Sequence, residues 1–112
     1  MQWAAVQTAR FPELQLLHHI PNGGKRSAAE AAHFKALGVK PGVPDLFLPV
    51  ARGGYHGLYI EMKAKGGRLS AFQRKMIAAL TEQGYACAVC FEWIDAAREI
   101  MAYMEGSYGD AV

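Results

Sequence analysis

The stretch Gly57-Leu-Tyr-Ile-Glu-Met-Lys63 contains the pattern that decides the fold. It is a short apolar run bounded on one side by a glycine-rich turn, which favours a β-strand. Side chains alternate across a strand, so Glu61 and Lys63 share one face while Met62 points to the other. The sequence therefore predicts a strand that ends in a carboxylate and an ammonium group on the same side of a sheet.

A second strand is predicted over Asp45-Leu-Phe-Leu-Pro-Val50, followed by the turn Arg52-Gly-Gly54. If the two strands pair as a hairpin, Asp45 lies near Glu61 and Lys63 at one end of the sheet. Two carboxylates brought close together repel each other unless a cation lies between them. Mg²⁺ binds one or two carboxylates and keeps several waters. Asp45 and Glu61 are therefore candidate metal ligands.

Two further groups complete this candidate site. The backbone carbonyl of Met62 lies between Glu61 and Lys63 and offers another hard oxygen ligand. Lys63 can hold an attacking water or stabilise negative charge that develops on a phosphoryl oxygen. The pair Glu-x-Lys is also common on exposed sheet faces, so the pair alone is weak evidence for a functional site. The functional interpretation depends on its context, namely the apolar strand that it ends, the nearby Asp45 and the basic segments around it.

The remaining elements are predicted from capping and periodicity. Capping boxes at Ser27 and Ser70 begin two helices, and the second carries an apolar stripe that includes Phe72. The expected elements are a helix over 2–10, a strand over 14–20, a helix over 27–37, the two strands of the hairpin, a helix over 70–83, a strand over 85–91 and a last helix capped by Asp95. This order predicts an α/β fold with a mixed sheet flanked by helices.

Charge is distributed unevenly along the 112 residues. Residues 1–75 contain 11 basic and 4 acidic side chains, which gives +7, whereas residues 76–112 contain 1 basic and 6 acidic side chains, which gives −5. This asymmetry indicates an anionic partner for the first part of the chain. The cations that follow the Glu-x-Lys strand are candidate phosphate contacts, namely Lys65, Arg68, Arg74 and Lys75.

Composition limits the class of protein. A hydrophobic fraction of 52% argues against disorder, and the length predicts one domain over 1–112. No apolar run approaches the roughly 20 residues of a membrane span, and no signal peptide is evident. The two cysteines are expected to be reduced. We therefore expect a cytoplasmic protein that does not interact with membranes.

Three other motifs have weaker functional interpretations. Gly23-Gly-Lys25-Arg26 precedes a capped helix and suits a phosphate, although a solvated basic turn explains it equally well. His18, His19 and Asn22, with His33, could suggest a His-Asn metal finger, but adjacent histidines on a strand face opposite ways. One of the two is expected to be buried and hydrogen-bonded. Cys87 and Cys90 are expected on opposite faces of a strand, as small core residues.

Four ordered motifs together resemble a known family. They are His19-Ile-Pro-Asn-Gly-Gly24, Gly42-Val-Pro-Asp45, Ile60-Glu-Met-Lys63 and then Gln73. Pro44-Asp45 with Glu61-Met62-Lys63 resembles the signature of the PD-(D/E)xK nuclease superfamily, and the full set resembles its VRR-NUC (virus-type replication-repair nuclease) domain. The resemblance extends from about Trp3 to Tyr103.

The resemblance implies a Mg²⁺- or Mn²⁺-dependent endodeoxyribonuclease with a restriction-endonuclease-like core. It implies that Asp45 and Glu61 bind the metal, that Lys63 is the catalytic lysine and that Gln73 supports the site, although a capping box also explains Gln73. It places His19 and Asn22 near the DNA. Stand-alone phage and bacterial members resemble Holliday-junction resolvases, which implies a homodimer that cuts branched DNA in a bacterial or phage-infected cell, in repair or recombination.

One departure leaves alternatives open. Many superfamily members carry a glutamate on the first helix, whereas this chain offers only Gln2 and Gln7 there, and its first acidic residue is Glu13. A non-cleaving module that binds DNA junctions would need no metal and is the main alternative. A sequence-specific restriction-type nuclease would need a recognition subdomain for which 112 residues leave little room.

Overall fold

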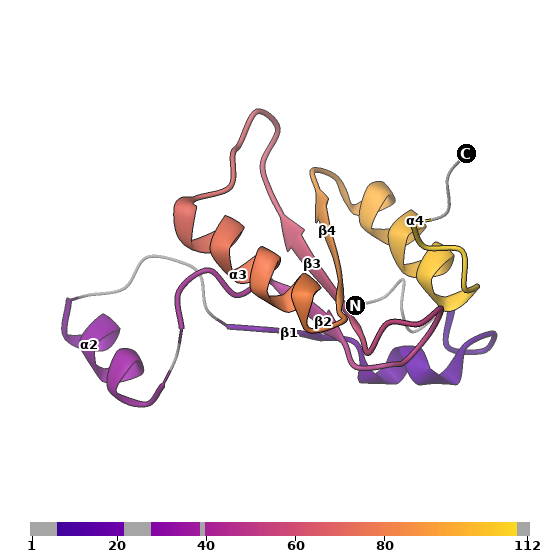
Figure 1. Cartoon of the computed structure of the whole chain (residues 1–112), viewed down its shortest axis with the longest axis horizontal. Helices are drawn as coiled ribbons and strands as arrows, with labels where there is room; N and C mark the ends of the chain where they lie inside the picture. The colour runs from indigo at the N-terminus through magenta and orange to yellow at the C-terminus, as the bar shows by residue number, and fades with distance from the viewer. Residues whose placement is uncertain (1–6, 22–27, 39, 110–112) are drawn as a thin grey trace.

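A computed structural model describes residues 7–21, 28–38 and 40–109. The chain forms a mixed sheet with helices on both sides (Figure 1). The elements in chain order are the 3-10 helix η1 (Pro12–Leu16), β1 (His18–His19), α2 (Ala28–Ala36), β2 (Leu46–Leu48), β3 (Leu58–Met62), α3 (Ala71–Glu82), β4 (Ala86–Cys90) and α4 (Trp93–Met104).

The four strands lie in the order β1-β2-β3-β4. β1 pairs with β2 and β2 with β3 in antiparallel fashion, whereas β3 and β4 are parallel and are connected through α3. Gly53 and Gly54, both with positive φ, close the turn between β2 and β3. The predicted hairpin and the mixed sheet flanked by helices are confirmed.

The two faces of the sheet have different coverings. Leu46, Leu48, Leu58 and Ile60 point to the face that α4 covers, and they form the core together with buried residues of that helix. The other face carries Phe47, Tyr59 and Glu61, because alternate residues of a strand point in opposite directions. There α3 lies along β4, and Cys87 Sγ is 4.0 Å from the Ile77 carbonyl oxygen.

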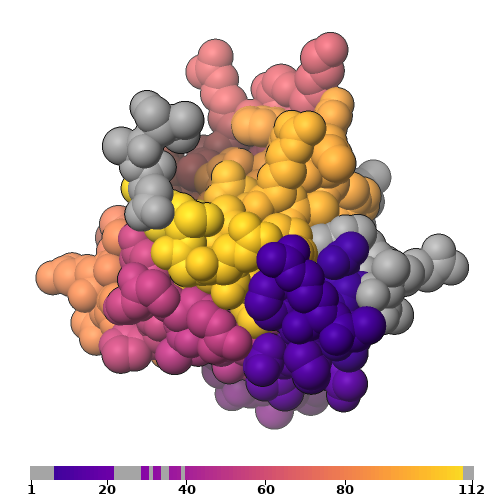
Figure 2. All heavy atoms as spheres, turned by 90° about the vertical axis from the view of Figure 1, so that its right-hand side faces the viewer, coloured from indigo at the N-terminus to yellow at the C-terminus, as the bar shows by residue number. Residues whose placement is uncertain are grey.

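The end of α4 joins distant parts of the chain (Figure 2). The buried Tyr103 hydroxyl donates a hydrogen bond to the Val50 carbonyl, just after β2, at 2.5 Å. Arg10 forms an ion pair of 3.1 Å with Glu105. Beyond the helix, the Tyr108 hydroxyl donates to the carbonyl of Cys87 in β4 at 2.9 Å. These contacts fix the ends of the hairpin and of the edge strand.

Several predicted elements are confirmed with shorter bounds. The helix that follows Ser70 has the predicted capping box, and the helix near residue 28 is present, although its predicted cap Ser27 lies outside the described residues. Cys87 and Cys90 are free, and Cys90 is buried in the core.

Four expectations are wrong. The strand expected over 14–20 is shortened to β1, because residues 12–16 form a 3-10 helix that begins at Pro12, a residue favoured at the first helical position. The last helix begins at Trp93 after Glu92, so Asp95 lies in its first turn and does not cap it. His18 and His19 are both exposed, and His18 Nδ1 bonds with the Leu16 carbonyl at 2.9 Å. Phe72 is exposed, although the rest of its apolar stripe is partly buried.

Within the described ranges, none of the helices combines the length and the apolar character that a membrane crossing requires.

Candidate active site

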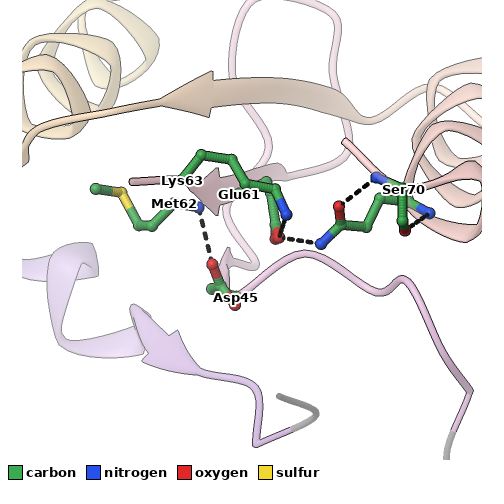
Figure 3. Close-up of polar contacts among 6 residues, drawn as sticks. Asp45, Glu61, Met62, Lys63 and Ser70 are labelled. Atoms are coloured by element: carbon green, nitrogen blue, oxygen red, sulfur yellow. Dashed lines mark hydrogen bonds and ion pairs between the residues drawn. The ribbon is translucent and has the colours of Figure 1, made fainter. Parts of the chain in front are cut away.

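Pairing of β2 with β3 brings Asp45 and Glu61 together. Leu46 pairs with Ile60, so extending this register by one residue places Asp45 opposite Glu61. The Met62 backbone N–H donates to Asp45 Oδ2 at 2.8 Å (Figure 3). On its other side, the Asp45 carbonyl accepts from the Ile20 backbone N–H at 2.6 Å. Asp45 is therefore held by both neighbouring strands.

Among the described residues, Glu61 is the acidic residue whose side chain is buried, with 3% of its surface exposed. Its Oε1 accepts a hydrogen bond of 2.6 Å from Gln73 Nε2 and lies 3.8 Å from Lys63 Nζ. Its Oε2 is buried and has no hydrogen-bond partner among the described residues. A buried carboxylate oxygen without a partner loses its hydrogen bonds to water and forms no hydrogen bond with the protein in their place. Oε2 is therefore the oxygen of Glu61 that a cation could bind.

The surroundings of Glu61 raise its pKa to about 7. Burial is the largest cause because it disfavours the charged form, and the negative charge of Asp45 adds to the effect. The ammonium group of Lys63 acts in the opposite direction and lowers the pKa. A cation between the two carboxylates would remove their repulsion and favour the charged form of Glu61.

Lys63 and the Met62 carbonyl border the same region. Lys63 lies two residues after Glu61 on the same sheet face, and 20% of its side-chain surface is exposed. The N–H and C=O of one strand residue point toward the same neighbouring strand. Since the Met62 N–H points to Asp45, its carbonyl is directed to that side as well. The structure is therefore compatible with the predicted positions of the Lys63 side chain and the Met62 carbonyl beside the two carboxylates.

Gln73 combines the two roles that the sequence left open. Ser70 Oγ accepts from the Gln73 backbone N–H at 3.1 Å, and Gln73 Oε1 accepts from the Ser70 backbone N–H at 2.8 Å. This capping box occupies the amide oxygen of Gln73, so its Nε2 faces Glu61. The cap therefore orients the amide group that contacts the buried carboxylate.

Gly42 joins the loop before Asp45 to the first turn of α3. Its φ is +85°, and a Cβ at this position would lie 2.5 Å from the carbonyl oxygen of Phe72 and 2.9 Å from the backbone nitrogen of Gln73. A side chain would therefore collide with backbone atoms. Gly42, Ser70 and Ile20 support the site, although sequence reasoning gave them no site role. The motif Gly42-Val-Pro-Asp45 was the available signal for Gly42.

The donor set of the site fits a divalent metal of the Mg²⁺ class. Asp45 and Glu61 supply carboxylate oxygens, Met62 supplies a carbonyl, and the orphaned Glu61 Oε2 is a free ligand atom. In the described residues, no three His, Cys, Asp or Glu side chains gather closely enough to form a denser metal cluster. Mg²⁺ accepts such a sparse protein ligand set because water and phosphate oxygens complete its shell.

The predicted DNA contacts are only partly described. His19 is exposed in β1 and pairs with Leu46, next to Asp45. The predicted phosphate contacts after β3 are all exposed, namely Lys65, Arg68, Arg74 and Lys75. The predictions for Asn22, Lys25 and Arg26 lie outside the described residues.

Glu13 does not replace the missing acidic residue of the first helix. It forms an ion pair of 3.5 Å with Arg52, in the turn at the opposite end of the hairpin from Asp45. Gln7 is in a helical turn and is partly exposed, whereas Gln2 lies outside the described residues. Glu13 is thereby excluded as a metal ligand.

Comparison with known proteins agrees with this geometry. The family model of the VRR-NUC domain matches residues 1–91. A solved structure described as a VRR_NUC domain protein is 34% identical, with a TM-score of 0.72, and the match covers 85% of this chain and 72% of that one. No curated protein matches the chain. Since the match includes Asp45, Glu61, Lys63 and Gln73, the chain belongs to the VRR-NUC family of nuclease-type domains.

Proposed function

We propose that this protein is a metal-dependent endodeoxyribonuclease that hydrolyses phosphodiester bonds in branched DNA, such as Holliday junctions. The orphaned, buried Oε2 of Glu61, opposite Asp45, is the observation that carries the proposal. A fold without a metal would gain by replacing such a carboxylate with an apolar or amide side chain. Membership of a nuclease-type family supports the same activity.

The proposed cofactor is Mg²⁺ or Mn²⁺, held by Asp45, Glu61 and the Met62 carbonyl. When bound, the metal polarises the phosphoryl group and lowers the pKa of water. In hydrolysis, a new bond forms between phosphorus and the water oxygen, and the P–O bond on the opposite side breaks. The attacking water loses a proton to the solvent, and the leaving oxygen takes up a proton from the solvent. In this proposal Lys63 stabilises the additional negative charge on the phosphoryl oxygens. Gln73 holds the Glu61 carboxylate in one orientation.

A DNA phosphate backbone suits the exposed cations around this site. The side chains of Lys65, Arg68, Arg74 and Lys75 are exposed, and none forms an ion pair with another described residue. Binding should therefore weaken steeply as salt rises, since each neutralised phosphate releases counterions.

We further propose that two copies act together, because two symmetric incisions in a junction need two active sites. Phe91, Trp93 and Ile94, at the beginning of α4, are large exposed apolar residues that suit a protein interface. Sedimentation should then report about 24 kDa, twice the 12.2 kDa chain. A protein that sediments only as a monomer while it cuts both strands would contradict this part of the proposal.

The decisive experiment incubates the protein with a labelled four-way junction or a linear duplex, in Mg²⁺, in Mn²⁺ or in EDTA. Cutting of the junction with either metal, and none in EDTA, is the expected result. Tight junction binding without cutting in any metal would instead favour the alternative, a non-cleaving junction-binding module. The sparse two-carboxylate ligand set is the observation that keeps this alternative open.

Lys63→Ala should lower the cleavage rate at saturating DNA by at least about 100-fold, the usual cost of losing one group that stabilises transition-state charge. DNA binding should change little. Lys65→Ala is the matched control. It also removes one lysine charge, but Lys65 is exposed and lies two residues after Lys63. The control should weaken binding slightly and leave the saturated rate unchanged. An unchanged rate in Lys63→Ala would remove Lys63 from the mechanism.

A further inference from the structure

Phe72 is a large apolar side chain in an unexpected environment. It lies in the first turn of α3 with 63% of its surface exposed, while Met76, Ile77 and Leu80 of the same stripe are partly buried against the sheet. Single exposed apolar residues are common in soluble proteins. The position and the neighbours of Phe72 therefore decide what its exposure means.

The backbone of Phe72 is fixed at the active site. Its carbonyl oxygen packs against Gly42, three residues before Asp45. The next residue, Gln73, donates to Glu61 Oε1. Phe72 lies one turn before Met76 on the same stripe, but at the N-terminal end of α3, where its side chain is exposed. The backbone that carries this exposed ring is thus held next to the carboxylate site through Gly42 and Gln73.

The charges near Phe72 distinguish it from the other exposed aromatic residues. In the sequence, Phe72 lies between Arg68 and the pair Arg74-Lys75, and all of these side chains are exposed. Trp93, which is 61% exposed, lies next to Glu92 and close to Asp95. Aromatic rings among cations are the combination with which proteins bind single-stranded nucleic acid, by stacking on bases and contacting phosphates. Acidic surroundings oppose such binding.

We propose that Phe72 stacks on the exposed face of a nucleobase at the branch point of the DNA substrate, beside the phosphate at the Asp45–Glu61 site. The inference rests on the proposed nuclease function and names the feature of the substrate that α3 recognises. A base inside a continuous duplex is stacked on both faces and must first be unstacked, whereas a base at an open branch point has one face without a stacking neighbour. Phe72 is therefore a specificity-determining residue that favours branched over fully paired DNA.

The test is a double-mutant cycle between the protein and the DNA. The affinity of a four-way junction is measured in EDTA, where no cutting occurs, for the wild type and Phe72→Leu. Single abasic sites are placed in turn at each nucleotide around the branch. At one position the wild type should lose about 5- to 150-fold in affinity, the range for one base–aromatic stack. Phe72→Leu should bind the intact junction as weakly as the wild type binds the junction with that abasic site. The abasic site should not weaken the binding of Phe72→Leu any further.

Two variants control this cycle. Phe72→Tyr keeps the ring and should keep the abasic penalty. Leu16→Ala removes another large exposed apolar side chain, which is 52% exposed and has no proposed role in DNA binding or in the dimer, and it should also keep the penalty. Since Phe72 is exposed, Phe72→Leu should unfold like the wild type, and thermal unfolding checks this. On linear duplex, Phe72→Leu should bind as tightly as the wild type.

The outcomes separate this inference from the nuclease proposal. If Phe72→Leu retains the abasic penalty, or if no position shows one, base stacking by Phe72 is wrong even when the protein cuts DNA. If Leu16→Ala loses the same penalty, the effect does not belong to Phe72 and the inference also fails. A penalty that only Phe72→Leu abolishes supports stacking, and it would stand even if neither metal supported cleavage.

Discussion

The helices α3 and α4 have the same length, 12 residues each, but they contribute to different properties of the molecule. α4 buries four residues in the core, namely Ala96, Ile100, Tyr103 and Met104. α3 has no fully buried residue, yet it supplies Gln73, the cap that orients Gln73, and exposed cations. One helix stabilises the fold and the other forms the site. Stability and activity should therefore respond to different substitutions.

The largest effect on stability is expected from Ile100→Ala in α4. Ile100 is 1% exposed, and truncation of a buried isoleucine costs about 2–5 kcal/mol of the free energy of unfolding. Ile77→Ala in α3 is the matched control, because the same side chain is there only partly buried and should cost less than about 2 kcal/mol. Urea denaturation measures both. Equal losses would show that the two helices do not differ in this way.

The next largest effect is expected on the pH dependence of stability, through the side chain of Glu61. The ordinary pKa of a glutamate is 4.5, whereas in the folded protein the pKa of Glu61 is about 7, so the folded state retains its proton more strongly than the unfolded state. Without metal, the stability that this group contributes should fall as pH rises from about 4.5 to about 7. The change should be on the order of 3 kcal/mol, because the pKa rises from 4.5 to about 7 and one unit of pKa corresponds to about 1.4 kcal/mol.

Denaturation at a series of pH values, with and without Mg²⁺, tests this prediction. Glu61→Gln should flatten the decline, and Mg²⁺ should stabilise the wild type more at pH 8 than at pH 5. Glu82→Gln, at the other end of α3, controls for the loss of one carboxylate. A decline of the same size in Glu61→Gln would assign the pH dependence to another group.

The smallest effect is expected from the helix caps. Ser70→Ala should cost about 1 kcal/mol of stability, the usual value of an N-cap hydrogen bond. It should also slow cleavage, since the cap orients Gln73, and Ser70→Thr should restore both. Glu92 occupies the N-cap of α4 without a side-chain cap bond, so Glu92→Ala should have less effect. If Ser70→Ala lowered stability but left cleavage and metal affinity unchanged, the cap would be purely structural.

Much of the sheet and the site could be predicted from local pattern. Alternation along Leu58–Met62 gave the face of Glu61 and Lys63, and the glycine turn indicated the hairpin that brings Asp45 near them. The capping box at Ser70 was visible because it is a contact between residues three apart. Each of these features depends on neighbours in the sequence or on one hairpin.

Features that depend on distant contacts could not be predicted. The contact of Gly42 with Phe72 joins segments 30 residues apart, and no local pattern encodes it. The apolar stripe of α3 did not reveal that Phe72 lies beyond the part of the helix that the sheet covers. The short apolar run after Pro12 predicted a strand over 14–20, but its first part is a 3-10 helix that begins at Pro12, and periodicity alone does not identify so short an apolar segment.

The contact between Tyr108 and β4 has a consequence for self-association. β4 is one of the two edge strands of the sheet, and an edge strand can template pairing with another chain and growth into aggregates. The Tyr108 hydroxyl occupies the Cys87 carbonyl on this strand, and Val89 beside it is 37% exposed. Tyr108, beyond the last helix, therefore occupies one of the backbone acceptors with which another strand would pair at this edge of the sheet.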